Sequence, residues 1–252
     1  MTVQITTETI PSFDGVQLAV HSAGEGRPVL LLHGLFSEAQ TNWVKFGHAE
    51  AIAAAGFRAI MPDFRAHGQS ATPTDAASYP QDVLVRDTEH LIAHYGLDDF
   101  DMGGFSLGAR TTARLLGKGL TPGKAILSGM GLEGLSGWGK RRMFFVDALA
   151  AYETAKRGDP HWMAIQFMKT QKVDRAAMGH LLASIPEAAI ENFADIDTPV
   201  LVLCGRDDRD NGSPQALADA LPNATLEWIE GTHMSCVTKP ELGQAMARFL
   251  SA

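Results

Sequence analysis

A short stretch of this 252-residue chain combines the residue types that nucleophilic catalysis needs. Gly104 to Gly108 reads G-x-S-x-G around Ser106, between an apolar run at 100–103 and helix-compatible sequence at 109–116. A serine on a sharp strand-to-helix turn is open to a base, and the flanking glycines leave the strained turn room. The helix start that follows offers unpaired N–H groups and a positive dipole end to an oxyanion. The motif predicts a serine nucleophile; the alternative is a glycine-rich turn with an incidental serine.

Two later stretches supply a base and an acid. Gly205-Arg206-Asp207-Asp208 follows the apolar run 199–204, and Gly231-Thr232-His233 follows an expected strand at 225–229. A serine hydroxyl is neutral at pH 7, so it needs an adjacent base such as His233. A carboxylate would hold the imidazole in one tautomer. Consecutive side chains at a strand end point to opposite sides, so one of the two aspartates faces the histidine. The residues alone leave Asp207 and Asp208 both open.

The apolar pattern predicts the elements that must position these groups. Alternating residues at 3–10 and 16–21, with Asp14-Gly15 between them, predict an antiparallel hairpin at a sheet edge. Further strands are expected at 29–32, 57–61, 100–103, 125–127, 199–204 and 225–229, with helical segments between them. This alternation is typical of an α/β fold with a mostly parallel twisted sheet and helices on both faces. Residues just past the carboxyl ends of parallel strands meet in one crevice, which brings the serine, the aspartates and the histidine together.

Two helices are predicted in more detail. From Asp82 the apolar spacing predicts a helix with Leu84, Leu91 and Tyr95 on its buried face and Asp87 off that face. Near the end of the chain, residues 238–241 read Thr-Lys-Pro-Glu, which predicts a capping box at the start of the last helix.

Residues 130–190 break the strand–helix alternation. They contain helical segments and no convincing strand, which predicts a helical lid inserted after the sixth strand, within one structural domain whose core is 1–129 and 191–252. The segment is rich in Met and aromatic residues, some of which would line an apolar acyl pocket. The run Lys140-Arg141-Arg142 is interpreted as a solvated helix start; the alternative is a lid that accepts a carboxylate- or CoA-bearing substrate.

Composition and charge exclude several other classes. Hydrophobic content of 45% and charged content of 20% are typical of a globular chain. A net charge of −8 without a basic run argues against a nucleic-acid partner. Residues 1–10 lack the features of a signal peptide, and no apolar run approaches the ~20 residues of a membrane span. The two cysteines and the acidic and histidine side chains have no metal-ligand spacing. We expect a cytoplasmic protein without metal or cofactor.

These stretches together resemble the α/β-hydrolase fold superfamily, from about Val16 to the C-terminus. The resemblance rests on His33-Gly34, on the D-x-R-x-H-G-x-S stretch at 63–70, and on the serine, aspartate and histidine stretches above. It implies that Asp208, the third residue after the glycine, is the acid. It implies that His33 braces the oxyanion loop, and that Ala66, where the family often has glycine, changes only local packing. Family members with an aspartate nucleophile, the haloalkane dehalogenases, are disfavoured by Ser106.

We therefore predict a cofactor-independent serine hydrolase that cleaves small to medium carboxylic esters through an acyl-enzyme. Ser106 would be the nucleophile, His233 the base and Asp208 the orienting acid, with the Leu35 and Leu107 N–H groups forming the oxyanion hole. The same residues could serve lactone or carbon–carbon bond hydrolysis, perhydrolysis, or a menaquinone-pathway type lyase reaction, because fold does not determine chemistry. An alternative of another class is a ligand receptor of this fold with weak turnover.

Overall fold

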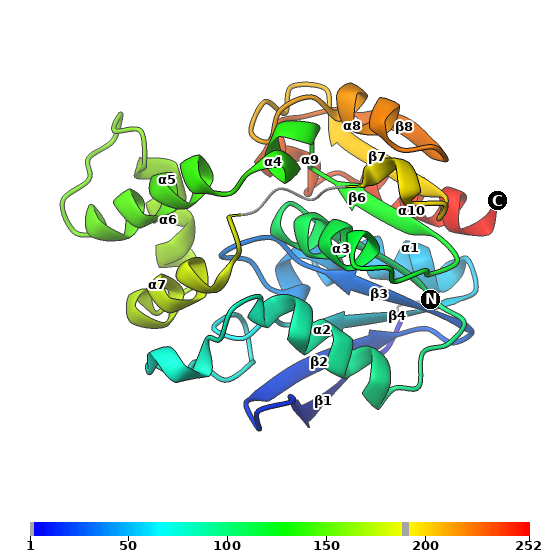
Figure 1. Ribbon diagram of the computed structural model, residues 1–252, viewed down its shortest axis with the longest axis horizontal. Helices are drawn as coiled ribbons and strands as arrows, with labels where there is room; N and C mark the ends of the chain where they lie inside the picture. Colours follow the sequence, from blue (N-terminus) through cyan, green and yellow to red (C-terminus); the bar gives the residue numbers. More distant parts are fainter. Residues whose placement is uncertain (1–2, 188–191) are drawn as a thin grey trace.

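An eight-stranded sheet forms the centre of the protein. The computed structural model describes residues 3–187 and 192–252 (Figure 1). The strand order across the sheet is β1-β2-β4-β3-β5-β6-β7-β8. The strands are β1 (Ile5–Pro11), β2 (Gln17–Ala23), β3 (Arg27–Leu32), β4 (Phe57–Pro62), β5 (Asp101–Phe105), β6 (Ala125–Ser128), β7 (Val200–Gly205) and β8 (Ala224–Ile229).

The first two strands form the predicted edge hairpin. β1 pairs antiparallel with β2, and β2 pairs antiparallel with β4, while every later pairing from β3 to β8 is parallel. The mostly parallel sheet predicted from the sequence is therefore confirmed. Because β3, β5, β7 and β8 run in the same direction, the loops after their carboxyl ends lie along one edge of the sheet.

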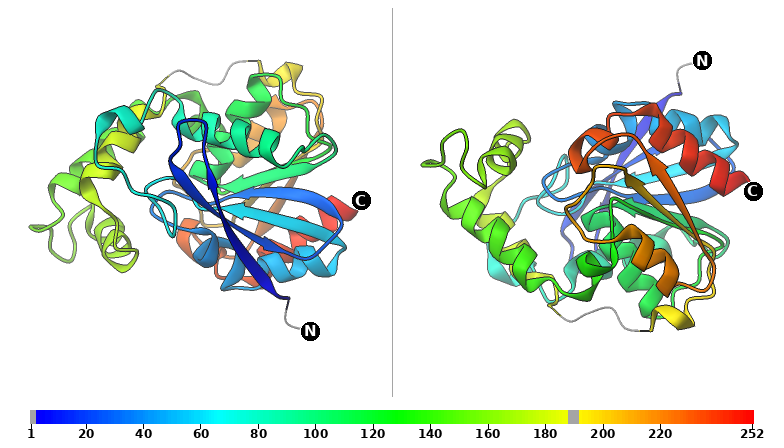
Figure 2. Two further views of the ribbon diagram at one scale, coloured as in Figure 1. Left: turned by 90° about the horizontal axis from the view of Figure 1, so that it is seen from below. Right: turned by 90° about the horizontal axis from the view of Figure 1, so that it is seen from above.

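Helices cover both faces of the sheet. In β3, Val29 and Leu31 pack with α1 (His48–Ala54) and α10 (Pro240–Ser251), whereas Leu30 and Leu32 pack on the opposite side. That opposite face carries α2 (Val83–His94), α3 (Leu107–Gly117) and α8 (Pro214–Ala220), and Figure 2 shows the two layers. A strand buried on both faces explains the uninterrupted apolar run of β3.

The described residues between β6 and residue 187 form four α-helices. They are α4 (Leu132–Ser136), α5 (Gly139–Ala150), α6 (Trp162–Thr170) and α7 (Arg175–Ser184), and α5 contacts both α6 and α7. In Figure 1 α5, α6 and α7 stand beside the sheet rather than over one of its faces, and α4 lies closer to the sheet, where it contacts α3 and α8. The predicted junction at residues 190 and 191 lies outside the described residues. Shorter turns complete the chain: η1 (Gln40–Val44), η2 (Ala76–Ser78), η3 (Phe193–Asp195) and α9 (His233–Cys236).

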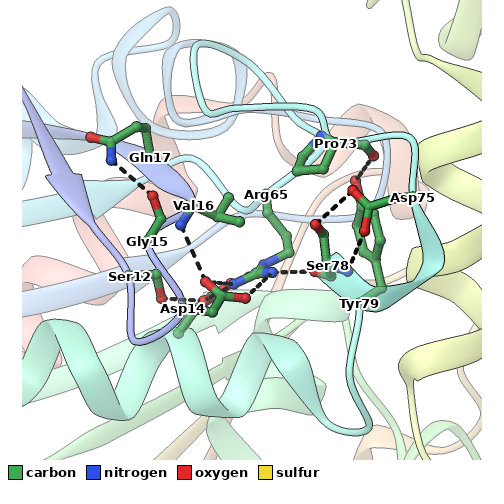
Figure 3. A network of polar contacts seen from close by, with 11 residues as sticks. Ser12, Asp14, Gly15, Val16, Gln17, Arg65, Pro73, Asp75, Ser78 and Tyr79 are labelled. Atoms are coloured by element: carbon green, nitrogen blue, oxygen red, sulfur yellow. Dashed lines mark hydrogen bonds and ion pairs between the residues drawn. The ribbon is translucent and has the colours of Figure 1, made fainter.

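The prediction that Asp87 lies off the buried face of its helix is wrong. Asp87 is buried on α2, where its two oxygens accept hydrogen bonds from the Arg65 guanidinium and one also accepts from Ser12. Asp14 and the Ser78 carbonyl complete the shell around Arg65 (Figure 3). A carboxylate tolerates burial when an opposite charge and hydrogen bonds satisfy it, and apolar periodicity does not reveal such a partner.

Two smaller predictions also need correction. The cap of α10 is Lys239, which makes no side-chain capping bond, so Thr238 does not head a capping box; the box is instead formed by Thr232 and Ser235 at α9. Ala66 has a φ of 63°, in the left-handed region that favours glycine. Alanine at position 66, where the family often has glycine, therefore strains the backbone in addition to changing the local packing.

Candidate active site

Ser106 sits on the turn that joins β5 to α3. Its φ of 53° and ψ of −109° are strained for a residue with a side chain. A Cβ on Gly104 would overlap the backbone of Gly108, and a Cβ on Gly108 would overlap the backbone of Leu32. The two glycines thus let α3 pack close to the sheet, and this close packing holds the serine in its unusual conformation.

A chain of two hydrogen bonds links Ser106, His233 and Asp208. The Ser106 Oγ lies 3.0 Å from His233 Nε2, and His233 Nδ1 lies 2.8 Å from Asp208 Oδ2. A carboxylate only accepts, so Nδ1 donates and Nε2 is left to accept the serine proton. The structure therefore brings together the three side chains that the sequence predicted, in the tautomer that a general base needs.

His233 and Asp208 are both held in place by buried surroundings. His233 begins α9 just after the Thr232 cap, and its ring lies 4.9 Å from the Phe105 ring. Burial would raise the pKa of Asp208, but the hydrogen bond and charge of His233, and a backbone N–H bond from Asp210, bring that pKa below its usual value. Asp208 is thus ionised at neutral pH and able to stabilise a protonated imidazole.

The loop after β3 lies beside this site, where Leu35 lines two cavities together with Ser106. Gly34 N–H donates to Asn42 Oδ1 at 3.0 Å, and Phe36 N–H donates to His67 Nε2 at 3.1 Å. Between them, Leu35 N–H has no acceptor among residues 3–187 and 192–252, and neither has Leu107 N–H at the start of α3. Unpaired donors near a nucleophile are suited to an oxyanion.

His33 and His67 support this loop as neutral groups. His33 Nε2 accepts from Phe64 N–H and its Nδ1 donates to the Gly34 carbonyl. Burial lowers the pKa of His33, and burial together with the nearby His33 lowers the pKa of His67 to about 3. Both histidines therefore remain uncharged at neutral pH and serve as fixed hydrogen-bonding groups.

Two cavities meet at Ser106. The larger, of about 240 Å³, is bounded by His233, Met234 and, from α6, Phe167. The smaller, of about 20 Å³, is bounded by Trp138, Phe145, Arg110 and Arg141. The insert thus supplies walls to both cavities, although two of its methionines, Met143 and Met163, are 51% and 69% exposed.

Comparison with known proteins agrees with this architecture. Residues 27–163 match the family model described as the alpha/beta hydrolase fold. The chain belongs to the α/β-hydrolase fold family. This confirms the family resemblance and the fold class that the sequence predicted.

Curated relatives of this α/β-hydrolase match only part of the chain. It is 42% identical over 66 residues, 26% of its length, to an epoxide hydrolase from Caballeronia sordidicola. It is 33% identical over 107 residues, 42% of its length, to the non-heme chloroperoxidase CPO-A1 from Kitasatospora aureofaciens. The matches span about a fifth and just over a third of those two relatives.

Solved structures are similar over nearly the whole chain. A hydrolase from Pseudomonas aeruginosa PA01 has a TM-score of 0.78 at 18% identity and covers 98% of this chain and 99% of its own. An esterase from Exiguobacterium antarcticum has the same TM-score at 16% identity and covers 98% of this chain and 100% of its own. At these identities the likeness establishes the fold alone.

The surroundings of the α/β-hydrolase site differ from the sequence predictions in some details. Asp207 is exposed, as expected for the aspartate that turns away. Of the two arginines beside it in the sequence, Arg206 pairs with Glu230 and Arg209 donates to main-chain carbonyls. In the basic run, Lys140 is exposed and Arg142 pairs with Glu187, whereas Arg141 reaches the smaller cavity.

Sequence reasoning missed two polar residues at the site, Asn42 and Arg110. Asn42 lies on a short π-helical turn that no apolar pattern signals. Arg110 could have been found, since it follows Ser106 by four residues and so shares its helix face. Within residues 3–187 and 192–252, no three His, Cys, Asp or Glu side chains are grouped to hold a metal ion. In the same part of the chain, every helix is too short or too polar to cross a bilayer.

Proposed function

We propose that this α/β-hydrolase cleaves carboxylic esters of small to medium size through a covalent acyl-enzyme. The observation that carries the proposal is the hydrogen-bonded chain from Ser106 through His233 to Asp208, at 3.0 and 2.8 Å. An arrangement of nucleophile, base and orienting acid is suited to acyl transfer.

The reaction proceeds in two halves. Ser106 Oγ attacks the ester carbonyl carbon while His233 Nε2 takes its proton, and the negative oxygen is stabilised by the Leu35 and Leu107 N–H groups. The protonated His233 then donates that proton to the leaving alkoxide, which departs as an alcohol and leaves an acyl group on Ser106. A water molecule, deprotonated by His233, attacks the acyl group and releases the carboxylic acid. Asp208 stabilises the imidazolium in both halves.

The insert at residues 130–190 acts in this proposal as a lid over the core formed by 1–129 and 191–252. Its described helices contribute Trp138, Phe145 and Phe167 to the walls of the two cavities. Apolar walls exclude water from the acyl group and strengthen the electrostatic interactions around the oxyanion. The larger cavity, whose volume is about 240 Å³, has room for a group of a few carbons beside Ser106 and His233.

Hydrolysis of p-nitrophenyl butyrate by matched variants tests the proposal. We expect Ser106→Ala to lower kcat/KM by a factor on the order of 10⁴ or more, because no other nucleophile is activated. Asp208→Asn should lower kcat by up to ~10⁴, because the amide permits the wrong imidazole tautomer. Asp207→Asn is the control, and since Asp207 is exposed and turned away it should stay within about twofold of the native rate.

Two outcomes would contradict this assignment. If Asp207→Asn were impaired and Asp208→Asn were not, the acid would be Asp207. If Ser106→Ala kept its activity, the hydrolysis would come from another site, and the proposed function would fail.

A further inference from the structure

Arg110 is a buried cation one helical turn after the proposed nucleophile. Its side chain is 1% exposed and lines the smaller cavity together with Ser106. The guanidinium donates to two main-chain carbonyls, those of Gly134 at 2.5 Å and Pro186 at 3.3 Å. Within residues 3–187 and 192–252, its Nε has no partner and no carboxylate pairs with it. A buried charge that only neutral carbonyls satisfy is costly to keep.

Asp82, an acid that lines a pocket together with Arg110, is engaged elsewhere. Asp82 receives two hydrogen bonds from Arg114, at 3.0 and 2.7 Å. Burial and, to a smaller extent, the charge of Arg114 lower the pKa of Arg110 to about 10, while Asp82 opposes the shift. An anion placed against Arg110 would relieve this unfavourable environment.

A second guanidinium faces the same cavity. Arg141, on α5, lines it together with Arg110 and Ser106. Its ion pair with Asp210 is long at 3.6 Å, and Asp210 is half exposed. Arg141 therefore keeps donors for a further acceptor, and the two arginines come from separate elements, the core helix α3 and the insert.

The position of His233 determines on which side of Ser106 the alcohol and the acyl part of the substrate lie. The leaving alcohol must be next to His233, which protonates it, and His233 lines only the larger cavity. The acyl part of the ester then extends to the other side of the serine, toward Arg110 and Arg141. The basic cavity thus lies toward the acyl end of the substrate rather than toward the alcohol.

We propose that the smaller cavity binds a carboxylate at the far end of the acyl chain, so that the preferred substrates are monoesters of short dicarboxylic acids. This inference rests on the proposed ester hydrolysis. It replaces the preference for neutral acyl chains that the apolar composition of the insert suggested. The cavity volume of about 20 Å³ suits one small end group and excludes a nucleotide such as that of CoA. Paired guanidinium groups match a carboxylate in charge and in hydrogen-bond geometry.

Hydrolysis of three esters tests the proposal, measured by pH-stat titration. The esters are monomethyl glutarate, its neutral isostere methyl 5-methylhexanoate, and 4-acetoxybutanoate, which carries its carboxylate on the alcohol. We expect the native enzyme to favour the glutarate ester by at least about tenfold in kcat/KM. Arg110→Met and Arg141→Gln should each reduce that preference on the order of tenfold to a hundredfold, since each removes a charged hydrogen bond. The rate with the neutral ester should stay within about threefold.

The control variant is Arg142→Gln, which removes the same charge from the neighbouring position of α5 on the Glu187 side. It should leave all three rates within about twofold. A native preference for the neutral ester, or for 4-acetoxybutanoate, would overturn the proposal. So would an equal loss on charged and neutral esters in Arg110→Met and Arg141→Gln, since that would indicate a structural role.

Calorimetry with glutarate separates this proposal from the proposed function. Ser106→Ala should bind glutarate, and the double variant Ser106→Ala/Arg110→Met should not. Absence of binding to Ser106→Ala would overturn the carboxylate subsite even if neutral esters were hydrolysed. Binding of glutarate by a protein that hydrolysed no ester would support the subsite and contradict the proposed function alone.

Discussion

Two arginines in this protein are equally buried but differently surrounded. Arg65, in the loop after β4, is 0% exposed and is paired with Asp87 and Asp14, with further bonds inside the same cluster (Figure 3). Arg110, on α3, is 1% exposed and donates to two carbonyls. Burial would lower the pKa of Arg65, but its two carboxylates raise it above the ordinary value, whereas the pKa of Arg110 falls to about 10.

The difference separates a group that stabilises the fold from one that is available to a ligand. Arg65 ties the β1–β2 hairpin, the loop after β4 and α2 together, so its charges are satisfied before any substrate arrives. Arg110 instead lines a cavity together with Ser106, the proposed nucleophile, and its Nε has no partner within residues 3–187 and 192–252. Charged side chains that remain incompletely paired in a cleft are candidates for substrate recognition.

The largest stability effect should come from Asp87→Ala. This change leaves Arg65 buried with only the partly exposed Asp14 as a counter-charge, so we expect a loss of about 3–5 kcal/mol in the free energy of unfolding. The control is Glu89→Ala on the same helix, where an exposed pair with Lys118 is worth about 1 kcal/mol or less. Urea denaturation measures both, and equal losses would mean that the Arg65 cluster is no more stabilising than a surface pair.

Arg110→Met should have a much smaller effect on stability. The variant no longer has to bury a cation, and this gain offsets the loss of the hydrogen bonds to Gly134 and Pro186. We therefore expect a change of about 1 kcal/mol or less in the free energy of unfolding. The same urea titration provides the measurement. A loss as large as that of Asp87→Ala would place Arg110 with Arg65 among the structural arginines and remove the contrast.

The same contrast explains what the sequence could and could not predict. Ser106, Asp208 and His233 were predicted because each follows a strand with a recognisable apolar pattern, and the order of such elements determines where their loops meet. Asp87 was misplaced because its partner, Arg65, lies 22 residues away, and helical periodicity carries no information about distant ion pairs. The position of Arg110 beside Ser106 could have been read from its spacing of four residues, but its availability to a ligand depends on which acids remain free, and only packing determines that.

The positions of short turns were equally hard to predict. Thr232 and Thr238 both precede helices, and only the structure shows that Thr232 forms the capping box. Ala66 adopts a left-handed conformation that its residue type does not suggest. The local sequence favours several positions about equally for a helix cap or a left-handed turn residue. Tertiary contacts then determine which position adopts that conformation.

The central claim is that Ser106 is the nucleophile of this α/β-hydrolase, and a covalent phosphonate probe tests it most directly. Peptide mass spectrometry after treatment with a fluorophosphonate should find one adduct, on the peptide that contains Ser106, and no adduct in Ser106→Ala. An adduct on a different residue, or unmodified Ser106 in a preparation that hydrolyses esters, would contradict the claim.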